Sequence, residues 1–257
     1  MTEDNASAPP SLVIEGHEAT IRLNRPRQHN RLEPDDLLVL MGMFEAIDAD
    51  RAIRVVTITA AGKSFSSGFN IGDLGQARAK EIPDFEAVVN RLEALRAPVI
   101  CALNGGVYGG STDLALACDF RLGVTGMQFR MPAAGLGLHY YPGGLRRYVS
   151  RLGLSNAKRL FLLAETVGAE ELLRLGYLDE VLAPEDLMPR AKALATRLAG
   201  NAPLAVQGTK LSLNDIARGV ADNADLAARA KAVSQSADFK EGRAAWLEKR
   251  VPVFRGE

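Results

Sequence analysis

The amino-acid sequence predicts an α/β protein in which strands and helices alternate in the first half and helices dominate the second. Runs rich in Val, Ile and Thr recur through the first half, and one of them ends in glycines that lead into a helix. From about Ser155 onward, Ala, Leu, Arg and Glu recur at helical spacing. A chain of 257 residues can bury a sizeable core as one large domain or two small ones.

The first ten residues are polar and end in two prolines, so we predict a disordered tail at 1–10. Three β-rich runs follow, and apolar residues at helical spacing separate the second run from the third. The strands are predicted in LVIEG, ATIRLN and IRVVTITA, and the helix in LLVLMGMFEAIDAD. This order is typical of the crossover connections of α/β proteins.

Two further strands enclose a short helix, and several helices follow them. The strands are predicted in APVICALNGG and DFRLGV, and the helix between them in STDLALACD. The later helices are predicted in NAKRLFLLAE, GAEELLRLG, EDLMPRAKALATRLAG, APLAVQGTKLSLNDIARG and DNADLAARAKAVSQ. Gly176 is typical of a helix end, and YLDEVLAP after it predicts a short return strand.

Composition excludes several classes of protein. The 31 Lys and Arg residues balance the 31 Asp and Glu residues, so no net charge favours nucleic acid or anionic lipid as a partner. Cys101 and Cys118 cannot form a disulfide scaffold, and the three histidines lack metal-type spacing. No run approaches the roughly 20 apolar residues that span a bilayer, and the first residues lack a signal-peptide pattern. We expect a cytoplasmic protein with no metal, membrane or nucleic-acid partner.

Two glycine-bearing loops follow β-rich runs, at Ser64–Leu74 and Asn104–Leu114. Glycine permits close backbone approaches, so such loops can aim two N–H groups into a cleft as an oxyanion hole. Tight turns between strands and helices are the alternative interpretation of both loops.

Seven blocks of the sequence, in order, resemble the crotonase family, also called the enoyl-CoA hydratase/isomerase superfamily. They are IRLNRP, KSFSSGFNIGDL, APVICALNGGVYGGSTDLALACDFRL, MQFRMPAAGLGLHYYPGGLRRY, LGYLDEVLAPEDL, NAPLAV and SADFKEGRAAWLEKRVPVFRG. The resemblance implies a spiral core of repeated ββα turns at 11–200 and a helical trimerisation region at 201–257. It also implies a homotrimer or hexamer and an acyl-CoA thioester substrate, with no separate cofactor because coenzyme A is part of the substrate.

Carried over residue by residue, the two oxyanion donors of the family fall on the backbone N–H groups of Phe69 and Gly110. The resemblance also implies that coenzyme A contacts the first loop and basic residues near both ends of the chain. The residues expected to bind it are Arg25, Arg27, Ser67, Phe69, Ile71, Lys249 and Arg250. Lys249 and Arg250 would act from a neighbouring subunit, and solvated surface charge is the alternative for the basic residues.

The sequence departs from the family at the catalytic carboxylates. Hydratases of the family use two glutamates to activate one water, and these positions correspond here to Asp113 and Ala133. Alanine cannot transfer protons, so efficient two-glutamate hydration is not expected. His139 and Tyr140 follow in the same loop as replacement groups for proton transfer. Methylmalonyl-CoA decarboxylase, a member of the family, is similar in having a tyrosine at this position and in its tail, but it has a histidine where this chain has Phe69.

The sequence therefore predicts an acyl-CoA enzyme of the enoyl-CoA hydratase/isomerase type, with Phe69, Gly110, Asp113, His139 and Tyr140 in its catalytic site. Two alternatives stay open, a decarboxylase of the methylmalonyl-CoA type and a non-catalytic acyl-CoA-binding homologue. Single residues also have structural alternatives: His139 as a hydrogen-bonded loop residue, Tyr140 as a pocket wall and Asp113 as a brace of its helix.

Overall fold

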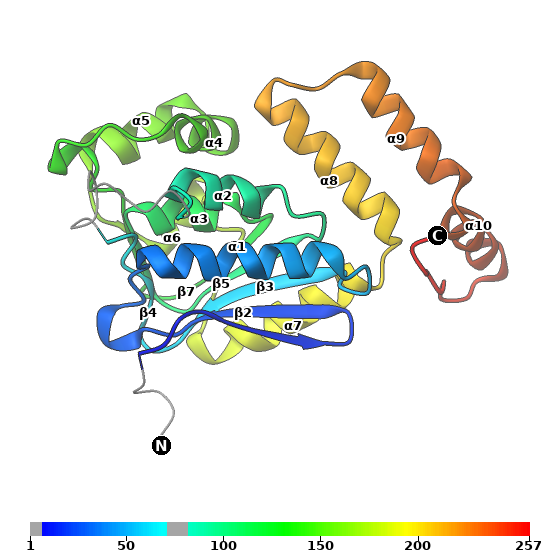
Figure 1. Cartoon of the computed structure of the whole chain (residues 1–257), viewed down its shortest axis with the longest axis horizontal. Coiled ribbons are helices and arrows are strands. Elements are labelled where there is room, and N and C mark those ends of the chain that lie inside the picture. The colour runs from blue at the N-terminus through cyan, green and yellow to red at the C-terminus, as the bar shows by residue number, and fades with distance from the viewer. Residues whose placement is uncertain (1–6, 71–81) are drawn as a thin grey trace.

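A computed structural model describes residues 7–70 and 82–257 and shows an α/β core with an arm of helices at its C-terminal end (Figure 1). The predicted α/β class is confirmed. The chain is anchored slightly before the predicted start of the core, because the Ala8 N–H donates to the carbonyl of Asn24 over 2.9 Å and Pro10 is buried. None of the described helices is long and apolar enough to cross a membrane.

The larger sheet has six strands in the order β1-β2-β3-β5-β7-β10. Only the β1–β2 pair is antiparallel among its neighbouring pairs. The strands are β1 (Ser11–Glu15), β2 (Glu18–Leu23), β3 (Val55–Ala60), β5 (Val99–Leu103), β7 (Phe120–Val124) and β10 (Glu180–Leu182). Each lies where the sequence predicted a strand. Every residue of β3 and β5 is buried, as is typical of central parallel strands that are covered on both faces.

A smaller sheet has four strands in the order β4-β6-β8-β9, with β4, β6 and β8 parallel and β9 antiparallel to β8. These strands are β4 (Ser64–Ser66), β6 (Gly106–Tyr108), β8 (Gln128–Arg130) and β9 (Val167–Gly168). The chain alternates between the sheets: β3 leads to β4 and α2, β5 leads to β6 and α3, and β7 leads to β8. This alternation is the spiral of ββα turns that the resemblance implied.

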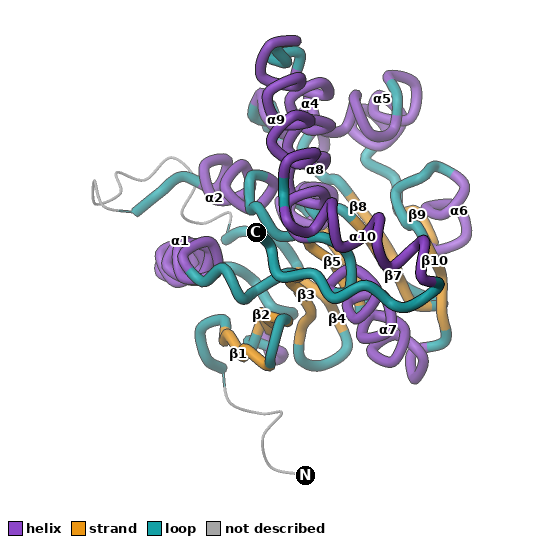
Figure 2. The backbone as a smooth tube through the Cα atoms, turned by 90° about the vertical axis from the view of Figure 1, so that its right-hand side faces the viewer, coloured by secondary structure: helices purple, strands orange, loops and turns teal. Residues whose placement is uncertain are grey.

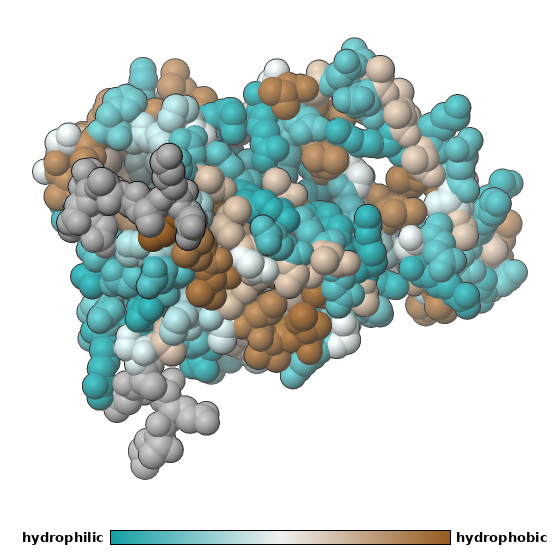
Figure 3. Space-filling view, in the orientation of Figure 1, coloured by the Kyte–Doolittle hydropathy of each residue, from teal (hydrophilic) through white to brown (hydrophobic). Residues whose placement is uncertain are grey.

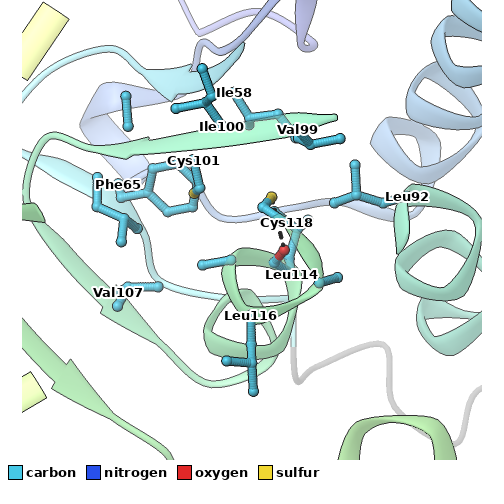
Figure 4. Packing of buried hydrophobic residues seen from close by; sticks show 14 of the residues in the cluster. Ile58, Phe65, Leu92, Val99, Ile100, Cys101, Val107, Leu114, Leu116 and Cys118 are labelled. Atoms are coloured by element: carbon cyan, nitrogen blue, oxygen red, sulfur yellow. Dashed lines mark hydrogen bonds between the residues drawn. The ribbon is translucent and has the colours of Figure 1, made fainter. Parts of the chain in front are cut away.

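Helices cover both faces of the larger sheet. Figures 1 and 2 show α1 (Pro34–Ala49) and α2 (Phe85–Glu93) on one face and α7 (Leu187–Ala199) on the other. Helix α1 begins with a capping box in which the side chains of Glu33 and Asp36 each accept a hydrogen bond from the backbone N–H of the other residue. Between the two sheets lies α3 (Gly110–Ala117), whose neighbours in the core include both cysteines (Figure 4). Both thiols are free and buried, and that of Cys118 donates to the carbonyl of Leu114 over 3.5 Å.

Helices α4 (Pro142–Leu152), α5 (Leu154–Leu163) and α6 (Ala169–Arg174) continue the core, with short 3₁₀ turns at Pro26–Gln28, Ala134–Leu136 and Pro184–Asp186. The arm contains α8 (Pro203–Arg218), α9 (Asn223–Gln235) and α10 (Ala237–Glu248). The boundary predicted at 200/201 falls in the turn between α7 and α8. The sequence analysis did not predict α10, which begins where the Ser236 hydroxyl accepts a hydrogen bond from the Phe239 N–H. Apolar residues gather along α8 and between α8 and α10 (Figure 3).

Candidate active site

A cavity of about 230 Å³ lies where the chain leaves the three parallel strands of the smaller sheet. Loops at the carboxyl ends of parallel strands meet at one edge of a sheet, which is why segments distant in sequence converge here. The start of α2 and the segment before α4 also contribute to the wall. Among the described residues, the lining consists of Ser67, Phe69, Phe85, Tyr108, Gly109, Gly110, Met131, Pro132, Ala133, Leu136, Leu138, His139, Tyr140 and Tyr141.

The two glycine-bearing loops are in direct contact. Gly68 has φ +96°, and a Cβ atom there would lie 2.8 Å from the Tyr108 carbonyl oxygen and 3.2 Å from the Gly110 nitrogen. Only glycine allows this approach. The Leu32 N–H donates to the Gly68 carbonyl over 2.9 Å, and the Asn70 N–H donates to the Leu32 carbonyl over 3.0 Å. In such a parallel bridge, the N–H of the residue between, Phe69, points away from Leu32.

Gly110 is the first residue of α3, where a backbone N–H has no acceptor within the helix. Like Phe69, it lines the cavity. The structure thus brings together, at one cavity, the two residues that the sequence singled out as backbone donors.

Asp113 lies beside the cavity but does not line it, because its side chain is 0 % exposed. Arg147 donates to both carboxylate oxygens, through Nε and through Nη2, each over 2.9 Å. The Tyr141 hydroxyl donates to Asp113 Oδ2 over 2.6 Å. The carboxylate is therefore held by three donors, and Tyr141 stands between it and the cavity.

Arg147 also connects this group to the helical arm. Its Nη1 donates to Glu93 Oε2 over 3.0 Å, and the same oxygen accepts from Arg218 Nη2 over 2.7 Å. Arg151 pairs with the other oxygen of Glu93 over 3.3 Å. Burial would raise the pKa of Glu93, but the charges of Arg147, Arg218 and Arg151 outweigh it and hold the pKa below its ordinary value of 4.5.

Tyr140 and Tyr141 are half-buried, and their rings stack with centroids 4.2 Å apart. The Tyr140 hydroxyl donates to the Tyr141 hydroxyl over 3.1 Å. Burial, together with the neighbouring Asp113 charge, raises the pKa of both hydroxyls well above 10. Both groups therefore stay protonated near neutral pH. His139 lines the same cavity and is exposed.

The residues predicted to bind coenzyme A do not all lie together. Ser67 and Phe69 line the cavity, whereas Ile71 falls outside the described residues. Arg25 is committed to Asp36, to which it donates through two nitrogens over 3.0 Å each. Arg27 is exposed in the turn after β2.

Lys249 and Arg250 follow α10, at the end of the molecule opposite β4 (Figure 1). Arg250 pairs there with Glu241 and Glu248. Within the chain these two residues are remote from the cavity, so their role from a neighbouring subunit stays a prediction.

Sequence reasoning missed Tyr141, Arg147 and Phe85. Arg147 and Tyr141 sit within the block around PGGLRRY, but periodicity cannot show that a residue before α4 and a residue within it point at the same carboxylate. Phe85 begins α2, a helix that the sequence analysis did not predict. Among residues 7–70 and 82–257, no group of three or more His, Cys, Asp or Glu side chains is arranged to hold a metal ion.

Comparison with known proteins identifies this arrangement. A family model described as enoyl-CoA hydratase/isomerase matches residues 15–257, nearly the whole chain. The chain belongs to the enoyl-CoA hydratase/isomerase family. This membership accounts for the ββα spiral and for the two glycine-bearing loops at one cavity.

Several members of the enoyl-CoA hydratase/isomerase family are similar over almost their full length. A crotonyl-CoA hydratase of Syntrophomonas wolfei is 35% identical over 256 residues, covering 95% of this chain and 97% of that protein. A short-chain-enoyl-CoA hydratase of Clostridium acetobutylicum is 35% identical, covering 93% and 94%. A solved enoyl-CoA hydratase structure from Geobacillus kaustophilus superimposes with a TM-score of 0.87 at 30% identity, covering 97% of this chain and 99% of that one.

Proposed function

We propose that the protein processes acyl-CoA thioesters and that the backbone N–H groups of Phe69 and Gly110 bind the thioester oxygen. The observation that supports the proposal is the close approach of Gly68 to the Gly110 nitrogen, together with the presence of both Phe69 and Gly110 in the cavity lining. Two preorganised donors stabilise the negative charge that develops on this oxygen as a thioester enolate forms. Hydratases with 35% identity to this chain support the substrate class.

Tyr141 is the proposed proton donor, with Tyr140 as its hydrogen-bond partner. The hydroxyls of both residues stay protonated because their pKa is raised, so each holds a proton at the cavity near neutral pH. Asp113 accepts from Tyr141 and from Arg147, so it positions Tyr141 and does not itself reach substrate. His139, exposed at the same cavity, is the proposed site of proton exchange with solvent.

Two-carboxylate hydration fits this site poorly. Among the described residues that line the cavity there is no Asp or Glu, and Ala133 occupies the position at which the family's second glutamate is expected. Isomerisation of a double bond beside the thioester also requires a base, for which His139 is the candidate among these residues.

Decarboxylation is the second candidate, and the combination of acids with no lining carboxylate favours it. In a 2-carboxyacyl thioester, the bond between the α-carbon and the carboxylate breaks, carbon dioxide leaves, and the electron pair passes to the thioester oxygen as an enolate. The Tyr141 O–H then turns from Asp113 toward the enolate and protonates the α-carbon, the electron pair returns from the oxygen to re-form the thioester carbonyl, and solvent returns a proton to the tyrosine. No base is needed in this reaction.

The test is a mass-spectrometric panel of crotonyl-CoA, 3-enoyl-CoA, 3-hydroxyacyl-CoA and methylmalonyl-CoA incubated with the full-length protein. We expect at least one thioester to be converted, with loss of 44 mass units identifying decarboxylation. Binding of thioesters without any conversion would favour the non-catalytic homologue. Absence of both binding and conversion would overturn the proposal.

A further inference from the structure

We infer that the acyl group held in this cavity is short and carries an aryl ring, as in a 3-arylpropanoyl or 3-arylpropenoyl thioester. The inference deepens the proposed function and rests on it. It is drawn from the side chains that form the cavity wall and from the size of the space that they enclose.

Four aromatic rings form a continuous wall along the cavity. The ring centroids of Phe69 and Phe85 are 5.8 Å apart, and those of Phe85 and Tyr141 are 6.2 Å apart. Tyr140 continues the wall by stacking on Tyr141 at 4.2 Å. All four side chains line the cavity. The Phe69–Phe85 and Phe85–Tyr141 distances fall within the 4.5–7 Å at which aromatic rings attract one another in tilted or offset arrangements, so a planar ligand ring can join the same series.

This wall starts at the proposed oxyanion site. A Cβ atom on Gly110 would lie 2.8 Å from the Phe85 ring, so the absence of a side chain at Gly110 lets that ring pack against the Gly110 backbone. A thioester oxygen held by the Gly110 N–H would therefore place the first carbons of its acyl group beside Phe85. The distance from the thioester to the aromatic wall is short, which favours an aryl ring only a few atoms from the carbonyl.

The volume agrees with this length. An apolar cavity of about 150 Å³ is enough to hold benzene, and a group the size of one water molecule, such as a methylene, takes about 30 Å³ more. A cavity of about 230 Å³ thus holds a phenyl ring and two or three further atoms. A linear chain could fill the same space, but it would lose the freedom of each rotatable bond, whereas a phenyl ring enters already rigid.

The small, buried Ala133 side chain lies on the same cavity, 6 % exposed, and no lining residue among those described is Asp, Glu, Lys or Arg. A charged group at the far end of the acyl chain would lose its hydration there without an ion partner among the described lining residues. These residues therefore favour a neutral ring at the end of the acyl group.

The experiment measures dissociation constants of 3-phenylpropanoyl-CoA and nonanoyl-CoA by isothermal titration calorimetry. Both acyl groups have the same number of carbons, and neither has an alkene or a 2-carboxylate, so the proposed reactions do not consume them. We expect 3-phenylpropanoyl-CoA to bind at least 10-fold more tightly. Equal binding, or tighter binding of nonanoyl-CoA, would overturn the inference even if the thioester panel shows turnover, whereas failure of both ligands and of crotonyl-CoA to bind would overturn the proposed function itself.

A pair of variants tests whether the ring wall is the cause. Phe85→Leu keeps an apolar side chain but removes one ring face, and we expect it to lower the preference for the aryl ligand about 5-fold with little change in nonanoyl-CoA binding. Phe120→Leu is the matched control, because Phe120 is a partly buried ring at the start of β7 that does not line the cavity. If a folded Phe85→Leu variant kept the wild-type preference for 3-phenylpropanoyl-CoA over nonanoyl-CoA, the ring wall would not be its cause. If the variant does not fold, the dissociation constants of the wild type decide the ligand class.

Discussion

The hydroxyl of Ser111 donates a hydrogen bond of 2.5 Å to the hydroxyl of Ser66, and both side chains are completely buried. Ser66 in turn donates to the carbonyl of Asn30 over 2.7 Å and accepts from the N–H of Gly68 over 3.1 Å. Ser66 ends β4 and Ser111 lies in the first turn of α3, so the pair links the two loops that carry the proposed donors. The separation of these loops is thus fixed by side chains that no ligand touches.

Replacing Ser111 with alanine should loosen this link. Ser66 would lose a buried partner, at a cost of about 1–3 kcal/mol in the free energy of unfolding. We expect turnover to fall about 10-fold and thioester binding to change little, because preorganised donors act mainly on the transition state. Denaturant unfolding and steady-state kinetics measure both effects.

Tyr148→Phe is the control for Ser111→Ala. The buried Tyr148 hydroxyl donates to the hydroxyl of Thr112 over 2.6 Å. Thr112 lies on α3, as Ser111 does, but this bond does not reach the first glycine-bearing loop. The Tyr148→Phe substitution should lower the free energy of unfolding by a similar amount without lowering turnover. Equal loss of turnover in both variants would mean that Ser111 acts only through general stability.

Removing the Tyr141 hydroxyl should lower turnover by about 100-fold or more, since a positioned proton-transfer group contributes on the order of 100- to 10,000-fold. Tyr140→Phe should have a similar or smaller effect, because the Tyr140 hydroxyl bonds to that of Tyr141 and not to Asp113.

Asp113→Asn should lower turnover at least as much as Tyr141→Phe. It should also destabilise the fold by about 3–5 kcal/mol by leaving Arg147 without its closest counter-ion. Steady-state rates and thermal unfolding, measured on each variant, separate a loss of catalysis from a loss of stability. Full activity in Tyr141→Phe would show that another group supplies the proton.

Introducing a glutamate at Ala133 should restore the carboxylate that the family's hydratases use. We expect crotonyl-CoA hydration to rise if its absence limits that reaction. The new carboxylate would also occupy the apolar cavity, so 3-phenylpropanoyl-CoA should bind more weakly. Ala133→Gln fills the same space without the charge and is the control, so an equal rise in hydration with glutamine would contradict this explanation.

Stability should fall in acid as Glu93 titrates. Its pKa in the folded protein is lower than the ordinary 4.5, so the folded state binds a proton less readily than the unfolded state. The stabilisation is therefore complete above about pH 4.5 and is lost as the pH falls through the folded value. Glu93→Gln should be less stable at pH 7 by about 3–5 kcal/mol and should lose less further stability between pH 5 and pH 3 than the wild type. Parallel pH dependence of unfolding in the two proteins would rule out this role for Glu93.

Assembly should cover the arm. Trp246 is 79 % exposed and Val251 is 84 % exposed, which is unusual for large apolar side chains. We propose that residues 201–257 pack against other subunits in a homotrimer or a hexamer made of two trimers. Trp246 is the only tryptophan, so its fluorescence should be that of a buried indole at micromolar concentration and should shift to the red in a Val251→Arg variant. Light scattering that shows a stable monomer of the wild type would contradict this assembly.

Most strands of the larger sheet could be predicted from sequence because they lie in apolar or β-branched runs of five or six residues, as in Val55–Ala60, where every side chain is buried. The strands of the smaller sheet have only two or three residues, too few for a period to show. Helix α10 escaped prediction because most of its apolar residues do not face a core within the chain. Trp246, for example, is exposed.

At the site, the family resemblance pointed to Phe69 and Gly110, and the glycine at 68 has a physical reason, because its backbone approaches the backbone of Tyr108 and Gly110 too closely for a side chain. The role of Asp113 could not be predicted in the same way. Whether a carboxylate faces a cavity or an arginine depends on a side chain 34 positions further along the chain, Arg147. The adjacent Tyr140 and Tyr141 are likewise indistinguishable by residue type, and only their hydrogen bonds show which one contacts the carboxylate.

The single carboxylate of Glu93 is shared by Arg147, which holds Asp113 beside the cavity, and by Arg218 at the end of α8. Glu93 is therefore a counter-ion both for the arm, through Arg218, and for the residues beside the cavity, through Arg147. If the last turn of α8 came away from the core, Glu93 would lose its ion pair with Arg218 and would interact more strongly with Arg147. The electric field at the tyrosine hydroxyls would then change. Arg218 does not line the cavity. Substitutions near it should nevertheless first change the pKa of the Tyr141 hydroxyl.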